Sequence, residues 1–194
     1  SLTFDITSDA RGALTGADYI ITTIRAGGDA GRLFDEKTCL AHGVLGQETT
    51  GAGGFAMAIR SVPTLVYYCT LAREVSNPGH LIFNFTNPSG IITQALRSCG
   101  FANVYGICDA PSGFIKQLEE ILNVPYGALD IECYGLNHLS WFRNAKLDGR
   151  DVQEELLNNP RTYQHSEMRL FTREMARLSG ECMLNEYLYF YYRR

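Results

Sequence analysis

The sequence predicts an α/β protein in which helices cover a parallel β-sheet, followed by the beginning of an α-rich subdomain. Short apolar runs rich in β-branched residues alternate with segments whose apolar residues recur at helical spacing. This alternation builds parallel sheets with right-handed crossovers. After about residue 125 it gives way to a strand pair and then to charged helical segments. We therefore expect a first partial domain over residues 1–125 and the start of a second over residues 126–194.

Each element follows from its local pattern. Residues 18–24 are a β-branched run that ends near two glycines, as a buried parallel strand does where it enters a loop. Residues 55–74 carry apolar side chains at helical spacing, interrupted by Pro63. The same patterns predict strands at 81–86, 104–108, 129–134 and 139–147, and helices at 91–98 and 111–122. Asp148-Gly149 is a hairpin turn signal, and the chain is helical in pattern beyond it.

The two ends of the chain are unusual. Residues 2–6 look like a strand, and residues 187–194 form an aromatic run without a capping glycine or a polar tail. Domains seldom start or stop inside their own core elements. We therefore expect the chain to be an internal part of a longer protein.

Composition excludes several classes of function. With 45% hydrophobic and 20% charged residues, the 194-residue chain is ordinary globular protein. Its net charge of −4 offers no basic field for a nucleic acid. No apolar run approaches the ~18 residues of a membrane span, so we expect no membrane partner. Six cysteines without a C-x-x-C pair favour free thiols and a cytoplasmic location.

Residues 51–56 match the pattern G-x-G-x-x-A of dinucleotide-binding loops. They follow Gln47-Glu-Thr-Thr50 rather than a strand, whereas the motif requires a strand that delivers its turn to a helix. We interpret them as a flexible turn before the helix that starts at Phe55.

Polar side chains follow four of the expected strands, where open parallel sheets bind ligands. Cys108 and His138 each follow a strand, so the two side chains can meet over the sheet. Two such ligands leave positions open on a metal that also binds substrate oxygens. Asp109 offers a carboxyl group for proton transfer, or alternatively caps the helix that follows Pro111.

The other strand ends carry cations and amides. Arg25 and Arg32 lie on an expected glycine-rich loop over residues 25–32, where they can clamp a phosphate or carboxylate, or equally pair with nearby acidic residues such as Asp29, Asp35 or Glu36. Asn87 precedes Pro88, and is either a turn residue or a hydrogen-bond partner of a substrate hydroxyl. Glu48 is either a ligand contact or a solvated loop charge.

Four motifs together resemble family 4 of the glycoside hydrolases, and within it the 6-phospho-β-glucosidases most. They lie in residues 35–54, in Asn84-Phe-Thr-Asn-Pro88, in Ile107-Cys-Asp-Ala-Pro111 and in Tyr134-Gly-Leu-Asn-His138. The resemblance covers nearly the whole chain. It implies a Rossmann-type fold akin to lactate and malate dehydrogenases, a bound NAD and a divalent metal, usually Mn²⁺.

The resemblance also implies the chemistry, which differs from that of two-carboxylate glycosidases. NAD takes a hydride from C3 of the sugar, a base removes the C2 proton, the aglycone is eliminated, water adds, and the hydride returns. The expected substrate is a 6-phosphorylated disaccharide or glucoside, and the expected full-length assembly is a homodimer or homotetramer. Residues 1–125 would then be part of the NAD-binding domain, and residues 126–194 the start of the catalytic, substrate-binding and oligomerisation domain.

Individual roles follow from the same resemblance. Cys108 and His138 correspond to the metal ligands, and Asp109 to the acid that assists the leaving group in some members. We expect the substrate at Arg32, Glu48, Asn87 and Asn137, and the cofactor at Arg25, Gln47 and Thr86. The family's glycine-rich NAD loop and catalytic tyrosine are expected before Ser1 and after Arg194.

Three alternatives remain. Asp109 is typical of 6-phospho-α-glucosidases, whereas β-specific members tend to have Asn at this position, so the anomer stays open. A 2-hydroxy-acid dehydrogenase shares the Thr86-Asn-Pro88 strand end but has no use for Cys108 and Asp109. The chain by itself is alternatively a catalytically inert domain.

Overall fold

The computed structural model describes residues 2–192 and divides the chain into two compact units, Ser1–Ile107 and Cys108–Arg194. The first unit contains the predicted parallel sheet, so the predicted α/β class is confirmed. The second unit is built on a separate antiparallel sheet. The functional division expected after residue 125 stays a prediction.

The sheet of the first unit consists of β1 (Tyr19–Thr22), β2 (Leu81–Asn84) and β3 (Val104–Gly106) in that spatial order. Both strand pairs are parallel. All three strands lie inside ranges predicted from their apolar β-branched runs, but each is shorter. The carboxyl ends of β1 and β2 therefore lie side by side and open onto the loops after them.

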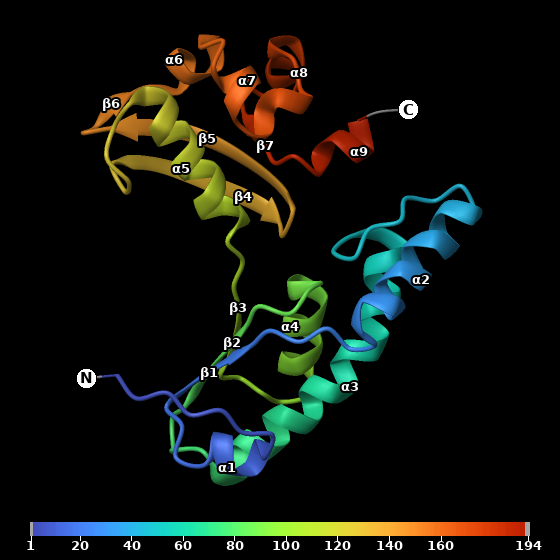
Figure 1. Ribbon diagram of the computed structural model, residues 1–194. Coiled ribbons are helices and arrows are strands. Elements are labelled where there is room, and N and C mark those ends of the chain that lie inside the picture. Colours follow the sequence, from blue (N-terminus) through green and yellow to red (C-terminus); the bar gives the residue numbers. More distant parts are fainter. Residues whose placement is uncertain (1, 193–194) are drawn as a thin grey trace. The chain divides into compact units, whose positions relative to one another are not determined.

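Two helices cover one face of this sheet (Figure 1). They are α3 (Gly51–Val75) and α4 (Ser89–Ser98), which pack against each other. Leu65 of α3, Ile82 of β2 and Ile92 of α4 are almost completely buried between the layers. Each such side chain contributes about 1.5–3 kcal/mol by leaving water. This layer holds the strand ends in place.

Helix α3 has 25 residues and a mean hydropathy of 1.2, which by length and composition suffices to cross a membrane. The helix reaches this limit by mean hydropathy, although Arg60 and Pro63 interrupt its apolar residues, so it contains no uninterrupted apolar run of that length. Packing accounts for the apolar character, because Leu65, Cys69 and Ala72 all belong to the buried core of the first unit. The same helix carries Arg60, whose ion pair with Asp35 is described below.

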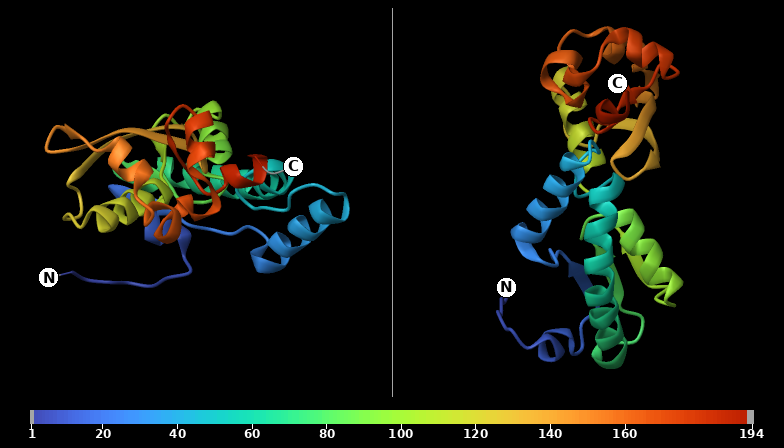
Figure 2. Two further views of the ribbon diagram at one scale, coloured as in Figure 1. Left: turned by 90° about the horizontal axis from the view of Figure 1, so that it is seen from above. Right: turned by 90° about the vertical axis from the view of Figure 1, so that its right-hand side faces the viewer.

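Three local predictions in the first unit are wrong. Residues 2–6 are exposed and form no strand. No described strand provides them with a hydrogen-bonding partner. The expected glycine-rich loop up to Arg32 is instead the start of helix α2 (Gly28–Ala41), which runs beside α3 (Figure 2). Residues 51–54 are the first turn of α3, not a flexible turn before it. A short helix, α1 (Ala10–Leu14), precedes the sheet.

The second unit is built on a hairpin of β4 (Leu129–Leu136) and β5 (Leu139–Leu147). Helix α5 (Ala110–Leu122) lies against it, and the Phe114 and Phe142 rings meet edge to face at 4.8 Å (Figure 1). Asp148 and Gly149 both have positive φ and form the predicted tight turn to β6 (Arg150–Asp151). The edge strand β7 (Met183–Leu184), which pairs with β5, was not predicted.

Short helices complete the second unit, in agreement with the helical pattern expected after residue 151. They are α6 (Gln153–Asn158), α7 (Thr162–His165), the 3₁₀ helix η1 (Glu167–Leu170), α8 (Arg173–Leu178) and α9 (Leu188–Tyr192). All six cysteines are free thiols, as expected.

Candidate functional site

Cys108 and His138 meet in the second unit. The Cys108 Sγ atom lies 3.3 Å from His138 Nε2, and both side chains are half-buried. Cys108 lies just before α5, and His138 lies in the two-residue turn between β4 and β5 with a left-handed backbone (φ 58°). The predicted encounter is confirmed, but its reason is different. His138 follows a strand of the antiparallel hairpin, not of the parallel sheet.

The surroundings of Cys108 act on its thiol in opposite directions. Burial raises the pKa of Cys108, and the negative charge of Asp109 raises it further. The backbone N–H groups of Ala110 and Asp109 and the side chain of Asn137 lower the pKa, but by less. A cation beside the sulfur would reverse this balance by stabilising the thiolate.

Asn137 contains an unsatisfied donor. Its Nδ2 atom is buried and has no hydrogen-bond partner among the described residues, so its contact with Cys108 is electrostatic rather than a well-formed hydrogen bond. A buried N–H₂ group without a partner costs about 1–3 kcal/mol. This cost is recovered when a ligand oxygen accepts from the amide.

Asp109 does not act as the helix cap that was its alternative role. It occupies the N-cap position of α5, but its side chain makes no capping hydrogen bond. Pro111 lies in the first turn, where the missing N–H costs nothing. The Asp109 carboxylate is exposed beside Cys108, so the structure is compatible with its expected role in proton transfer.

Tyr187 was not singled out by the sequence analysis. Its ring stacks on the His138 imidazole with centroids 4.5 Å apart and an angle of 23° between the planes. It immediately precedes α9, 49 residues after His138, and no spacing rule connects the two. The only available signal was its place in an aromatic run, which is equally typical of a core segment.

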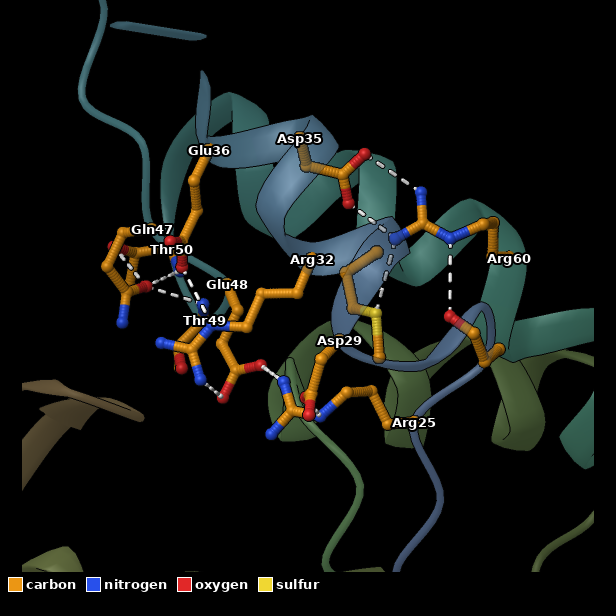
Figure 3. Close-up of polar contacts among 12 residues, drawn as sticks. Arg25, Asp29, Arg32, Asp35, Glu36, Gln47, Glu48, Thr49, Thr50 and Arg60 are labelled. Atoms are coloured by element: carbon orange, nitrogen blue, oxygen red, sulfur yellow. Dashed lines mark hydrogen bonds and ion pairs between the residues drawn. The ribbon is translucent and has the colours of Figure 1, made fainter. Parts of the chain in front are cut away.

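Arg25 in the loop after β1 and Arg32 in helix α2 converge on one carboxylate (Figure 3). Arg25 forms an ion pair with Glu48, and Arg32 Nη1 lies 3.7 Å from the other oxygen of the same carboxylate. Arg25 also pairs with Asp29, and Arg32 with Glu36. The expected pairing with nearby acidic residues is therefore observed for both arginines, whereas the clamping of a phosphate or carboxylate ligand stays a prediction.

Asp35 has a different partner from the one considered. It is buried, and it forms a two-pronged ion pair with Arg60 of α3 (Figure 3). Gln47 supports the neighbouring loop, because its Oε1 atom accepts hydrogen bonds from the backbone N–H groups of Thr49 and Thr50. These contacts fix the loop before α3 and so place Glu48.

A pocket of about 230 Å³ lies at the carboxyl ends of β1 and β2. Four predicted site residues line it, namely Arg25, Glu48, Thr86 and Asn87. The Thr86 hydroxyl accepts from Ile24 N at 3.0 Å and is buried. The structure therefore gathers these residues as predicted, whereas their individual roles remain predictions.

Asn84 stabilises the strand ends that line this pocket, and the sequence pattern did not identify it as a site residue. It is fully buried at the end of β2 and accepts from the Thr22 hydroxyl at 2.9 Å. Its amide donates to the Thr86 carbonyl and to the Thr93 hydroxyl at 3.2 Å. A polar residue in an otherwise apolar strand was the signal that could have identified it.

The donor set of the cysteine and histidine pair fits a metal with open positions. Among the described residues, no group of three or more His, Cys, Asp and Glu side chains could hold a metal. A closed structural zinc site is therefore not formed within residues 2–192. A thiolate and an imidazole beside an unsatisfied amide suit a metal that completes its coordination with water or ligand oxygens.

The fold and these strand ends define a Rossmann-type α/β protein whose fold is similar to that of the lactate and malate dehydrogenases. Lactate dehydrogenase from Eimeria maxima superposes over 93% of this chain with a TM-score of 0.55 at 15% identity, a likeness of fold alone. The sequence profile of the family 4 glycosyl hydrolases matches residues 1–124, and that of their C-terminal domain matches residues 133–194. The chain belongs to this family.

Relatives within the family are similar over most of this chain. The 6-phospho-β-glucosidase BglT of Thermotoga maritima is 39% identical over 155 residues, which are 79% of this chain and 37% of the relative. A T. maritima 6-phospho-β-glucosidase structure with manganese, NAD⁺ and glucose-6-phosphate has a TM-score of 0.85 at 34% identity. A 6-phospho-α-glucosidase from gut microorganisms, with NAD and Mn²⁺, has a TM-score of 0.83 at 29% identity.

The matches cover most of this chain but only part of each relative. Each of the two structures matches 96% of this chain. The match covers only 44% of the 6-phospho-β-glucosidase chain and 46% of the 6-phospho-α-glucosidase chain. The chain therefore spans less than half the length of these relatives.

Proposed function

We propose that this chain is part of an NAD- and metal-dependent 6-phospho-glucosidase. Membership of family 4 supports the proposal, as do relatives that bind NAD, manganese and glucose-6-phosphate. The single observation that carries it is the Cys108–His138 pair, because a plain hydroxy-acid dehydrogenase has no use for a thiol there. We further propose a cytoplasmic homo-oligomer.

In this proposal Cys108 and His138 hold a divalent metal, with Mn²⁺ the expected ion. Such a metal, when bound, acts as a Lewis acid on a sugar oxygen. With Cys108 and His138 as its protein ligands, such a metal would complete its coordination with water or substrate oxygen atoms. The unsatisfied Asn137 amide lies in the same turn as His138 and donates a hydrogen bond to the substrate.

Two side chains beside the pair are suited to proton transfer. The exposed Asp109 carboxyl group gives a proton to the leaving-group oxygen. The Tyr187 ring that stacks on His138 carries a phenol hydroxyl, so the chain contains a candidate base.

The first unit contributes contacts to substrate and cofactor. We assign Arg32, Glu48 and Asn87 to the substrate. Arg25, Gln47 and Thr86 are assigned to NAD. The pocket at the ends of β1 and β2 supports these assignments, since it gathers residues of both groups.

The anomer of the substrate is left to experiment. The relatives include a 6-phospho-β-glucosidase and a 6-phospho-α-glucosidase, whose structures have TM-scores of 0.85 and 0.83 with this chain. The β form is our first choice because the sequence resembles β-specific members most. Asp109 is the residue that favours the α form.

The test is hydrolysis of the nitrophenyl 6-phospho-α- and 6-phospho-β-glucosides by the full-length protein. Turnover of one of the two is expected only when both NAD and Mn²⁺ are supplied. Turnover that survives removal of both would refute the proposed function. NADH formation with 2-hydroxy acids, and not with phospho-glucosides, would instead identify a dehydrogenase.

A further inference from the structure

A chain of buried polar groups connects η1 to the start of α9 in the second unit. Glu167 Oε2 accepts hydrogen bonds from Asn185 Nδ2 and from the backbone N–H of Glu186, both at 2.9 Å. Asn185 Oδ1 accepts from the backbone N–H of Tyr187 at 3.2 Å. The Asn185 N–H donates to the Ser140 carbonyl of β5 at 3.0 Å. Asn185 thus links three segments.

This network ends at the candidate metal ligand. Ser140 lies two residues after His138, and Tyr187 stacks on the His138 ring. The Tyr187 backbone and strand β5, which begins directly after His138, are therefore held by the same buried residue, Asn185. Asn185 is 1% exposed and Glu167 is 8% exposed, so water does not replace these bonds.

Magnitudes indicate which interaction determines the position of Tyr187. An aromatic pair contributes about 0.5–1.5 kcal/mol beyond its buried area. Loss of the Glu167 carboxylate would leave two buried donors without an acceptor, at about 1–3 kcal/mol each. The hydrogen bonds to Glu167 therefore outweigh the stacking contact.

We propose that Glu167 and Asn185 are positioning residues that hold Tyr187 against the imidazole of His138. Neither touches the proposed metal or substrate. They act through the backbone of residues 185–187, and fix the Tyr187 ring, which covers one face of the His138 imidazole. The consequence for metal binding rests on the proposed function, whereas the positioning itself does not.

The chain offers a matched control in Glu119. Its carboxylate is also buried and also accepts from two backbone N–H groups, those of Gly127 at 2.8 Å and Leu129 at 3.0 Å. Its partners are Gly127 in the loop before β4 and Leu129 at the first position of β4, and no hydrogen bond of Glu119 among the described residues reaches residues 185–187. Truncation of Glu119 therefore reports the general cost of losing a buried carboxylate in this unit.

The test is the NMR chemical shift of the His138 ring protons, which sense the ring current of Tyr187. The chain has four histidines, so a His138→Gln spectrum assigns the signal. Glu167→Ala and Asn185→Ser should move it towards its position in Tyr187→Leu. Glu167→Gln, which keeps one acceptor oxygen for both donors, should leave it unchanged, as should Glu119→Ala.

An unchanged shift in both Glu167→Ala and Asn185→Ser would overturn the proposal, and so would an equal loss in Glu119→Ala. Asn185→Ser alone decides the question if Glu167→Ala does not fold.

A titration with Mn²⁺ is the second readout. Glu167→Ala should weaken binding by about 10-fold, a typical effect of groups that orient a ligand, while Glu167→Gln and Glu119→Ala stay within about 2-fold of the unaltered chain. Equal affinity in Glu167→Ala would contradict the predicted effect on the metal. No Mn²⁺ binding by the unaltered chain would count against the metal site itself, whereas the NMR shift would still decide on positioning.

Discussion

At the scale of single residues, the candidate metal pair owes its geometry to local backbone structure. Cys108 is fixed by the start of α5, and His138 by a tight turn in which it adopts a positive φ. A non-glycine residue in that region is uncommon and is tolerated where the surroundings hold it. His138 is so held by its contacts with Cys108 and Tyr187.

The first prediction concerns this pair. Cys108→Ser and His138→Gln should each weaken Mn²⁺ binding by more than about 10-fold, because each removes one of two protein ligands. Isothermal titration calorimetry measures the change. Cys133→Ser and His165→Gln alter exposed residues of the same kinds and serve as controls. Binding that is equally weakened by the controls would speak against the assignment.

The second prediction concerns pH. Burial is the main cause that raises the pKa of Glu167 from 4.5 to about 7 in the folded protein. The folded state therefore holds this proton more tightly than the unfolded state. Its contribution to stability is fully present below pH 4.5 and is lost as the pH rises through 7. The loss amounts to at most about 3 kcal/mol.

Glu167→Gln removes this titration and keeps an acceptor oxygen. The difference in unfolding free energy between Glu167→Gln and the unaltered chain should therefore grow from pH 5 to pH 8. Urea denaturation at four or five pH values measures it. A difference that stays constant over this range would show that Glu167 does not titrate there.

At the scale of elements, the first turn of α3 is the feature that the sequence pattern misrepresented. The pattern G-x-G-x-x-A indicates either a phosphate loop or a flexible turn, but the structure shows a tightly packed helical turn. Gly53 and Gly54 are buried against the loop that holds Gln47 and Glu48. Glycine is needed at positions 53 and 54 because a side chain there would collide with the backbone of this loop.

The third prediction follows from this packing. A Cβ atom on Gly53 would lie 2.6 Å from the Gln47 carbonyl oxygen, so Gly53→Ala must displace backbone. We expect a loss of about 1–3 kcal/mol in urea unfolding. Gly90→Ala, in α4 of the same unit, meets no atom within 4 Å and should be neutral or up to about 1 kcal/mol stabilising. Equal stability of the two variants would refute this account.

The elements show which predictions the sequence supports and where it fails. Strands β1, β2 and β3 were predictable because each is a short apolar run with turn signals on both sides. Helix α2 was missed because Gly27, Gly28 and Gly31 suggested a loop, whereas only Gly27 and Gly28 have a positive φ and the helix continues through Gly31. Strand β7 has two residues, which is too short for any periodicity.

The candidate sites divide in the same way. Residues at the ends of β1 and β2 could be found because parallel strands end at one edge. Tyr187, Glu167 and Asn185 could not, since their contacts depend on how the chain folds back onto the β4–β5 hairpin. Long-range packing of this kind leaves no local signal.

At the scale of the whole molecule, the chain contains two separate cores. Leu65, Ile92 and Val104 belong to the first, and Phe114 and Phe142 to the second. Each unit therefore has its own source of stability.

The fourth prediction is that a truncation in one core destabilises only the unit that contains it. Phe142→Ala should cost about 3–5 kcal/mol, and Leu65→Ala about 2–5 kcal/mol. Hydrogen exchange measured by mass spectrometry should accelerate in α5, β4 and β5 for Phe142→Ala, and in α3, α4 and β2 for Leu65→Ala. Acceleration throughout the chain in either variant would show instead that the units unfold together.

The carboxylate shared by Arg25 and Arg32 has a consequence for the arrival of charged ligands. These two cations face three anions, Asp29, Glu36 and Glu48, so the formal charge of the cluster is −1. Such a cluster exerts no long-range pull on a phosphorylated sugar. A dianion can be recognised there only at contact, by exchange for a carboxylate. The rate of association at this loop should therefore depend little on ionic strength, and selectivity would come from close-range geometry rather than from electrostatic steering.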